Sequence, residues 1–271
     1  MIRKSSLLRI ALSFTVAIAL VAYLWSVSTT PVEKNLVPSI SKSADKPVPD
    51  FSQYTQTKKK KTAFFDYLKP EIQQQNDHIL GIRHQLLLMK RKADNGEVLA
   101  FRESEKLNWL AKEYRVESDE IAIGGKGEDS QSSLINALLV RVDIIPLDLV
   151  LVQAANESAW GTSRFAREGY NFFGLWCFTE GCGFVPNSRN AGAIHEVEKF
   201  DNLTDAVYTY LRNLNRHDAY QELRKVRAQL RANQQPISGN ALAEGLVNYS
   251  ERGHEYVEEI QAMIRINKKY F

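Results

Sequence analysis

The chain has 271 residues, of which 44% are hydrophobic and 25% are charged, and its formal net charge at pH 7 is +3. This size and composition allow one large domain or two small ones with a substantial apolar core. The mild charge excludes the dense basic surface typical of a nucleic-acid-binding protein. Only two cysteines are present, and the five histidines do not have the spacing of metal ligands, so we expect neither a metal site nor a cofactor.

The N-terminus predicts a membrane-targeting segment. Three basic residues, Arg3, Lys4 and Arg9, precede a nearly apolar stretch, residues 10–27. About 18 residues are just enough to span a bilayer and exceed the usual ~7–15-residue core of a signal peptide. Because basic flanks stay in the cytoplasm, the pattern favours an anchor in the inner membrane and a periplasmic body. A cleaved signal peptide is the alternative.

Composition divides the chain into four segments. We expect a signal anchor or signal peptide in residues 1–28. Residues 29–62 are rich in Ser, Thr, Pro and Lys and lack an apolar period, which predicts a disordered linker. Residues 63–125 carry apolar residues at helical spacing, interrupted once by Pro70, and predict a helical N-terminal extension. The main domain would then occupy residues 126–271. The glycine-rich loop at its start lacks the Gly-Lys-Ser/Thr ending of a phosphate-binding loop, which excludes a nucleotide as partner.

The main domain is predicted to be mainly α-helical. One of its helical stretches, PLDLVLVQAANESAWG, opens with Pro146 at a favourable first-turn position. Residues 175–200 have no helical period and close with the alternating AIHEVEKF, which predicts a strand. We therefore expect an α domain with one small β-hairpin lobe. Cys177 and Cys182 lie at the start of this lobe, and an oxidising compartment would favour a disulfide between them.

Glu157 is the candidate catalytic residue. On a helical wheel it lies at the edge of an apolar stripe that includes Val150, Leu151 and Ala154. A carboxyl group placed where an apolar face meets a cleft is partly desolvated, which raises its pKa and keeps it protonated near neutral pH. A general acid for glycoside cleavage requires that state. The position alone favours an ordinary helix-terminal glutamate that contacts solvent or an arginine.

Four motifs change this interpretation: AANESAWG, YNFFGLW, FDNLTDAVYTYLRNL with the strand before it, and NYSERGHEYVEEI. Together they resemble the endo-β-N-acetylglucosaminidases of glycoside hydrolase family 73, which are peptidoglycan hydrolases with a lysozyme-like α fold. The resemblance covers the chain from about residue 144 to the C-terminus. The first motif alone also occurs in soluble lytic transglycosylases.

The resemblance implies roles for individual residues. Glu157 matches the catalytic acid, and Tyr249 matches the tyrosine that approaches the scissile sugar. The implied substrate-binding set consists of aromatic and polar side chains: Trp160, Asn171, Phe173, Trp176 and Tyr256. Without the resemblance, aromatic residues in such a motif are more often part of a core.

The second carboxylate of the family lies in the β lobe, where the match weakens. Glu180, Glu196 and Glu198 are the candidates. We favour Glu196, because strand alternation can aim it across the cleft at Glu157. The alternative in which the lobe supplies no catalytic carboxylate stays open.

The later helices carry a series of basic residues. They are Arg212, Arg216, Arg224, Lys225, Arg227 and Arg231. The series predicts a solvated helix face or, as a weaker option, electrostatic steering toward the carboxylates of cell-wall peptides.

The resemblance therefore predicts a cell-wall hydrolase that cleaves the β-1,4 bond after N-acetylglucosamine in peptidoglycan glycan strands. A second carboxylate could activate water and give inversion; alternatively, the acetamido oxygen of the substrate could attack, with Tyr249 helping to orient it. A lytic transglycosylase or muramidase and a non-catalytic peptidoglycan-binding adaptor are the competing interpretations.

Overall fold

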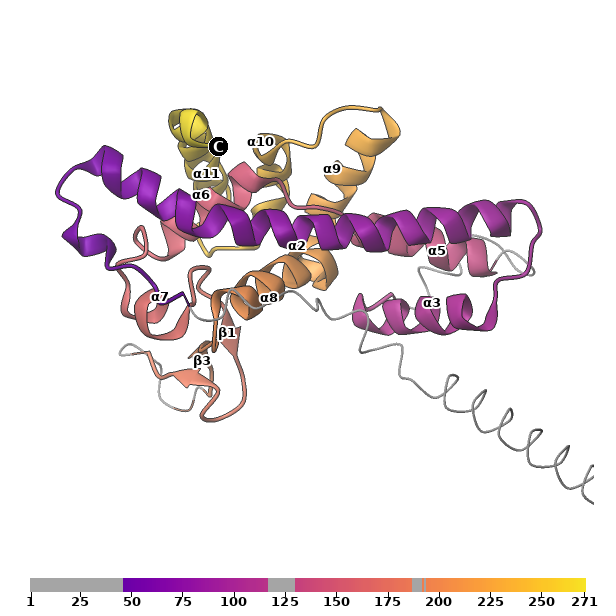
Figure 1. The fold of residues 1–271 in the computed structure, drawn as a ribbon, viewed down its shortest axis with the longest axis horizontal. Helices are drawn as coiled ribbons and strands as arrows, with labels where there is room; N and C mark the ends of the chain where they lie inside the picture. The colour runs from indigo at the N-terminus through magenta and orange to yellow at the C-terminus, as the bar shows by residue number, and fades with distance from the viewer. Residues whose placement is uncertain (1–45, 117–129, 187–191, 193) are drawn as a thin grey trace, which may run out of the picture. The chain divides into compact units, whose positions relative to one another are not determined.

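The long helix α2 (Thr57–Asp94) organises the part of the chain that the structure describes (Figure 1). The structure is a computed structural model, and it describes residues 46–116, 130–186, 192 and 194–271. The other helices in these ranges are α3 (Phe101–Glu113), α5 (Ser130–Arg141), α6 (Leu147–Glu157), α7 (Arg164–Gly169), α8 (Leu203–Arg216), α9 (Gln221–Ala232), α10 (Gly239–Leu242) and α11 (His254–Asn267). Short 3-10 turns occur at Phe51–Gln53, Asp218–Tyr220, Ala243–Leu246 and Lys268–Tyr270.

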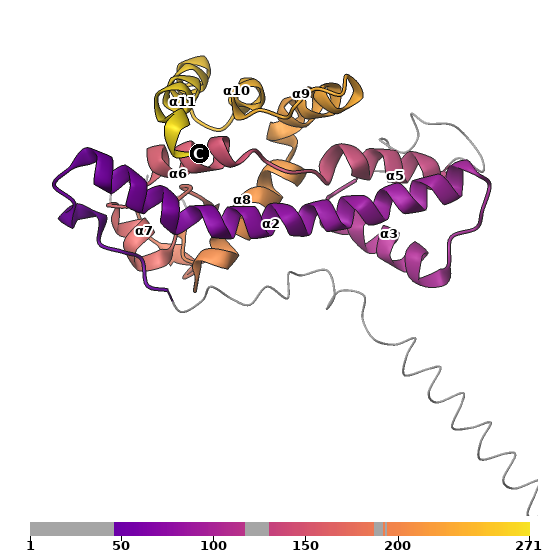
Figure 2. The same cartoon turned by 45° about the horizontal axis from the view of Figure 1, so that its top comes forward.

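Helix α2 belongs to the same core as the later helices. It packs against α5, α6 and α8, and its buried residues, which include Phe64, Phe65 and Leu68, join one apolar cluster with residues as distant as Ile264. Figures 1 and 2 show α10 and α11 on one side of α2, and α8 lies below α2 in Figure 1. The segment predicted as an N-terminal extension is therefore an integral layer of the folded body.

Pro70 does not interrupt α2, whereas the sequence pattern predicted a break there. The helix continues through Pro70 to Asp94. Proline removes one backbone hydrogen bond, the one that the carbonyl of residue i−4 would accept. Pro70 and Asp66, the residue at i−4, are both exposed, so water can satisfy that carbonyl and the helix tolerates the proline.

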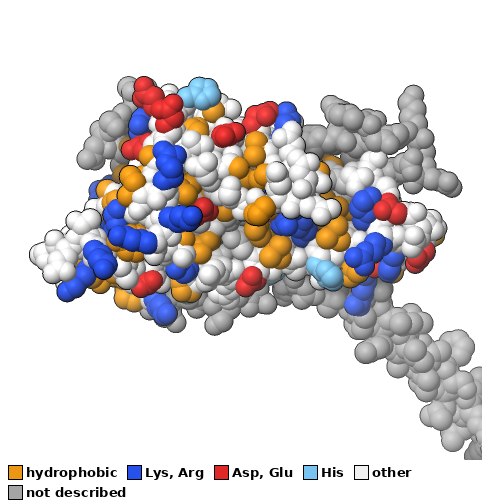
Figure 3. Space-filling model, turned by 90° about the horizontal axis from the view of Figure 1, so that it is seen from above, with side chains coloured by type: hydrophobic (Ala, Val, Ile, Leu, Met, Phe, Trp, Pro, Cys, Tyr) orange, Lys and Arg blue, Asp and Glu red, His pale blue; other side chains and the backbone are white. Residues whose placement is uncertain are grey.

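Ordered structure begins before the predicted linker boundary at residue 62. Phe51 is buried, and its ring packs on Phe64 with centroids 5.3 Å apart. The run Lys58–Lys61 forms the first turns of α2 rather than part of a spacer, and Lys61 donates a hydrogen bond to Asn267. Figure 3 shows several Lys and Arg side chains toward this end of the body.

The β lobe predicted after Gly174 is confirmed, as a small three-stranded antiparallel sheet. Its strands are β1 (Trp176–Cys177), β2 (Gly183–Phe184) and β3 (Glu196–Glu198), in the order β1-β3-β2. Trp176 and Phe184 both pair with Val197 at the centre of the sheet. The predicted disulfide between Cys177 and Cys182 is also present. The expected mainly helical fold with a small β lobe is thus what the chain adopts.

The predicted membrane anchor, residues 10–27, lies outside the described residues, as does most of the glycine-rich loop near residue 126. Within the described part of the chain, no helix has both the length and the apolar character that crossing a bilayer requires.

The prediction of a solvated basic face is wrong for two of its arginines. Arg224 and Arg227 are almost completely buried. Arg227 donates hydrogen bonds to the carbonyls of Val140, Arg141, Asp143 and Ile144, where α5 ends. Val140 and Arg141 lie in the last turn of α5, whose carbonyls have no partner within the helix, and Asp143 and Ile144 follow it. The guanidinium group donates to all four carbonyls.

Candidate active site

A cleft of about 370 Å³ lies between the C-terminal end of α6, one face of α8, the β lobe and the segment before α11. Its walls combine carboxylates, basic groups and aromatic rings: Glu157, Gly174, Leu175, Trp176, Phe178, Glu198, Thr209, Arg212, Asn213, Arg216, His217, Tyr220, Tyr249 and Ser250. A concave site in which polar groups converge beside aromatic rings is a candidate substrate-binding pocket.

Glu157 is the last residue of α6 and lines this cleft. Burial is the main cause that raises the pKa of its carboxyl group, and a hydrogen bond from Tyr256 opposes the shift. The negative end of the helix dipole also disfavours a carboxylate at this position. The carboxyl group of Glu157 therefore keeps its proton to a higher pH than an exposed glutamate does.

Gly174 lies beside the carboxyl group of Glu157. A Cβ atom at this position would lie 3.4 Å from Glu157 Oε2, and the backbone φ of +64° is one that glycine adopts without strain. The backbone conformation, rather than the space beside Oε2, therefore favours glycine here.

A directed chain of hydrogen bonds holds the other oxygen of Glu157. The Tyr210 hydroxyl donates to Gln153 Oε1 at 2.5 Å, and Gln153 Nε2 donates to the Tyr256 oxygen at 2.9 Å. The Tyr256 hydroxyl then donates to Glu157 Oε1 at 2.8 Å. Because Oε1 accepts a hydrogen bond, Oε2 is the oxygen that carries the proton when Glu157 is protonated.

Tyr249 lines the cleft beside this chain. Its ring stacks on that of Tyr256, with centroids 5.5 Å apart and planes within 7°. Its hydroxyl donates to the carbonyl of Phe173 at 2.8 Å, so its ring is held against the cleft. Tyr249 and Tyr256 therefore lie together next to Glu157.

Asn171 and Phe173 shape the cleft from beneath instead of lining it. Asn171 is buried, and its side-chain amide donates to the carbonyls of Leu175 and Glu198. Phe173 is buried and stacks on Tyr210 at 4.1 Å. Both residues hold the turn before the β lobe in position.

The two tryptophans predicted to bind substrate have different surroundings. Trp176 lines the cleft and is 48% exposed. Trp160 is not among the cleft residues; its ring packs edge-on against Phe64 and Phe65, and the Lys61 ammonium lies 4.8 Å from the ring centre. Trp160 therefore joins the end of α6 to α2.

The glutamates of β3 also differ. Glu198 is half-buried and lines the cleft; burial raises the pKa of its carboxyl group, and Arg212 opposes the shift. Glu196 is 4% exposed and accepts hydrogen bonds from the backbone amides of Gly181 and Gly183. The structure thus brings Glu198, and not Glu196, to the same cleft as Glu157, while Glu180 is exposed in the disulfide loop and is not a cleft residue.

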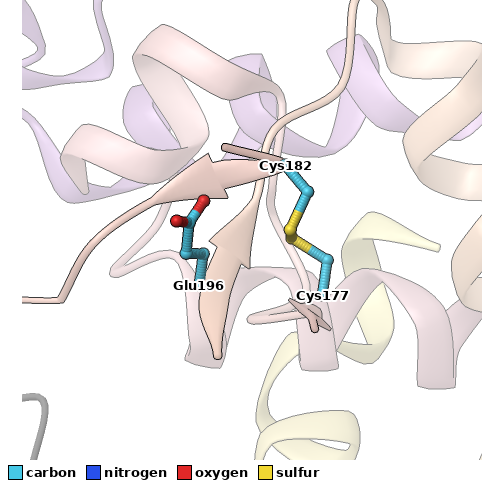
Figure 4. A group of neighbouring side chains, drawn as sticks. All are labelled: Cys177, Cys182 and Glu196. Atoms are coloured by element: carbon cyan, nitrogen blue, oxygen red, sulfur yellow. A yellow bond between two sulfur atoms is a disulfide. The ribbon is translucent and has the colours of Figure 1, made fainter. Parts of the chain in front are cut away.

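One group in the described residues has the spacing of a metal site. Possible ligand atoms of Cys177, Cys182 and Glu196 lie within 4.8 Å of one another (Figure 4). The two sulfur atoms are bonded to each other, and a disulfide offers no thiolate to a metal ion. Glu196 instead fixes the loop that the disulfide closes.

The cleft face of α8 was predicted only in part: Arg212 and Arg216 were expected on a solvated face or as steering charges, and Thr209 and Asn213 had no predicted role. Thr209, Arg212, Asn213 and Arg216 follow the spacing i, i+3, i+4, i+7 and therefore lie on one side of the helix. The opposite side of α8 is apolar and buried. The spacing of these polar residues is visible in the sequence. The same spacing is also typical of a solvated helix face, so it does not by itself identify a cleft wall.

Comparisons with known proteins identify a family model and a relative that match most of the chain's folded body. The family model described as "Mannosyl-glycoprotein endo-beta-N-acetylglucosaminidase" matches residues 132–269. The protein named "Protein bax" from Escherichia coli (strain K12) is 32% identical over 222 residues, which are 82% of this chain and 75% of that protein. No solved structure matches the chain.

Proposed function

Because the chain belongs to the glucosaminidase family and is a glycoside hydrolase, we propose that it cleaves the β-1,4 bond after N-acetylglucosamine in peptidoglycan, with Glu157 as general acid. The observation that carries this proposal is the environment of Glu157: a carboxyl group at the end of a helix, in a cleft, with a pKa raised by burial. Such a group can donate a proton to the leaving glycosidic oxygen near neutral pH.

The hydrogen bonds around Glu157 suggest how the proton is delivered. Tyr256 holds Oε1, so Oε2, which faces Gly174, is the donor to the glycosidic oxygen. Loss of the proton leaves a carboxylate that the Tyr256 hydroxyl stabilises, since a hydrogen bond to a charged acceptor is stronger than one to a neutral acceptor. The same contact therefore orients the acid and supports its conjugate base.

For the second carboxylate we propose Glu198 instead of Glu196. Glu198 faces the cleft, and its raised pKa brings it closer to the operating pH of a general base. A water molecule activated by Glu198 would attack the anomeric carbon and invert its configuration. Attack by the acetamido oxygen of the substrate, oriented by Tyr249, is the competing route and retains the configuration.

Glu157→Gln tests the general acid. It is close to isosteric and keeps the acceptor for Tyr256, so hydrolysis of purified peptidoglycan should fall by about 10²-fold or more while glycan binding persists. Clearing of peptidoglycan in gels measures the activity, and mass spectrometry of the products identifies the bond. A new reducing N-acetylglucosamine end supports the proposal, whereas a 1,6-anhydro end indicates a lytic transglycosylase. Binding without clearing by the wild type would indicate an adaptor.

Glu198→Gln and Glu196→Gln form a matched pair on the same strand. We expect Glu198→Gln to lower the rate by about 10²-fold with little change in unfolding temperature. Azide, a small nucleophile, should partly restore the activity of Glu198→Ala. Glu196→Gln should lower the unfolding temperature, because it weakens two charge-assisted hydrogen bonds, and retain more activity. If both glutamine variants keep near-normal rates, the lobe supplies no base, and the anomer formed first, read by NMR, should show retention.

We further propose that the body of the protein works in the periplasm, anchored in the inner membrane by residues 10–27. The disulfide between Cys177 and Cys182 supports an oxidising compartment. Cell fractionation followed by N-terminal sequencing of the mature protein tests the location and separates an uncleaved anchor from a cleaved signal peptide.

A further inference from the structure

Two arginines and a histidine form the wall of the cleft at the C-terminal end of α8. Arg212, Arg216 and His217 all line the cleft that holds Glu157 and Glu198. His217 Nδ1 accepts a hydrogen bond from the Ala219 amide at 3.2 Å, so the neutral imidazole carries its proton on Nε2. All three side chains are therefore hydrogen-bond donors in this wall.

One carboxylate from another helix braces both arginines. Glu113, the last residue of α3, lies 3.2 Å from Arg212 Nε and 3.8 Å from Arg216 Nη1, and its backbone carbonyl accepts from Arg216 Nη1 at 3.4 Å. The Tyr208 hydroxyl donates to the same carboxylate at 3.3 Å. Glu113 thus holds two guanidinium groups side by side, and α3 lies outside the residues that the family model matches.

Two cations share one bracing carboxylate in this part of the cleft. One braced carboxylate faces two guanidinium groups, each with five N–H donors. Burial, followed by repulsion from Arg212 and Arg115, lowers the pKa of Arg216. Glu198, the proposed base, lines the same cleft, and Arg212 opposes the rise that burial causes in the pKa of its carboxyl group. An anion bound here would relieve the repulsion between the cations.

We propose that Arg212, Arg216 and His217 form a subsite for a free carboxylate of the peptide attached to the glycan, held in shape by Glu113. The inference rests on the proposed function, since the glycan in the cleft brings the peptide with it. Guanidinium groups bind carboxylates in a planar, two-point geometry that other cations do not match. The subsite would make the enzyme prefer glycan strands whose peptides carry unmodified carboxyl groups.

The test compares two preparations of one substrate. Soluble glycan strands with their peptides are divided, and the carboxyl groups of one half are converted to amides with ammonia. The wild type should show a kcat/KM about tenfold higher on the native strands, mainly through a lower KM. The ratio should decrease with added salt, because exposed ion pairs are screened.

Substitutions assign the preference to the subsite. Arg216→Gln should reduce the ratio of the two kcat/KM values toward one, and Arg216→Lys, which keeps the charge, should retain part of it. Lys225→Gln removes one positive charge at an exposed position, where Lys225 pairs with Glu222, and should leave the ratio unchanged. Arg212→Gln gives the same readout if Arg216→Gln does not fold.

Several results would overturn the subsite. One is a wild-type ratio near one between kcat/KM on native and on amidated strands. Another is a ratio that stays high in both Arg216→Gln and Arg212→Gln while kcat/KM on the two substrates falls equally. If the wild type cleaves neither preparation, the proposed hydrolysis is wrong. The subsite is then tested by measuring binding to the two preparations instead of kcat/KM. Tighter binding of Glu157→Gln protein to native than to amidated strands, lost when Arg216→Gln is added, would still support the subsite, and equal binding would refute it.

Discussion

Tyr256→Phe removes one hydroxyl group from the surroundings of Glu157 and should change its pKa in a defined direction. The hydroxyl donates to Glu157 Oε1 at 2.8 Å and lowers the pKa that burial raises. Phenylalanine keeps the ring that stacks on Tyr249. The substitution therefore isolates the hydrogen bond from the packing, and the pKa of Glu157 should rise further.

The size of the shift follows from the strength of the bond. A hydrogen bond to a charged acceptor contributes about 1.5–3 kcal/mol, and one pKa unit corresponds to about 1.4 kcal/mol. We expect the pKa of Glu157 to rise by about 1–2 units. A general acid must be protonated, so activity is lost as pH rises through its pKa; the descending limb of the pH profile should move upward by the same amount.

The assay is kcat/KM on soluble peptidoglycan strands over a wide pH range, which reports the pKa values of the free enzyme. Tyr249→Phe is the matched control, because its hydroxyl binds the Phe173 carbonyl and not Glu157; its descending limb should stay in place. Gln153→Met, one step further from Glu157, should give a smaller shift in the same direction. A descending limb that is unmoved or moves downward in Tyr256→Phe would refute the role assigned to the hydroxyl.

Three further predictions concern stability. Burial raises the pKa of Glu157 above its value in the unfolded chain. Ionisation of Glu157 therefore destabilises the fold as pH rises from the unfolded pKa through the folded pKa. By calorimetry, the unfolding temperature of Glu157→Gln should exceed that of the wild type at pH 8 and match it near pH 4. Arg227→Met should cost about 3 kcal/mol or more in urea unfolding, because it removes a buried guanidinium group that donates to four backbone carbonyls at and just after the end of α5. The exposed Lys225→Met should change stability by less than about 0.5 kcal/mol. Gly174→Ala should cost about 1–2 kcal/mol in urea unfolding through its positive φ, and unchanged stability would contradict this strain.

Local patterns predicted most of the helices and the position of the catalytic candidate. The apolar spacing in α6 and α8 depends only on residues within two turns, and the period identifies a helix wherever it packs. Glu157 at the edge of an apolar stripe is such a local feature. The sequence also determined the disulfide partners, because a chain with two cysteines allows one intramolecular pair.

The same patterns did not determine which lobe carboxylate reaches the cleft. Glu196 and Glu198 are two residues apart on β3, so alternation assigns them to the same side and cannot separate them. The difference arises because the disulfide loop turns the amides of Gly181 and Gly183 toward Glu196. A carboxylate that accepts two backbone amides stays with them, and only the folded loop shows where those amides are.

Tertiary structure also decided the contacts that give Glu157 its chemistry. Gln153 reaches Tyr210 across 57 residues of sequence and Tyr256 across 103, and Tyr256 reaches Glu157 across 99. Helical period predicts that each of these residues faces inward, but not which inward-facing groups meet. The motif of Trp160 suggested a sugar contact, whereas the structure packs its partly buried ring against Phe64 and Phe65 of α2. Hydrogen-bond partners and burial depend on how separate helices pack together, and that packing is a property of the whole chain.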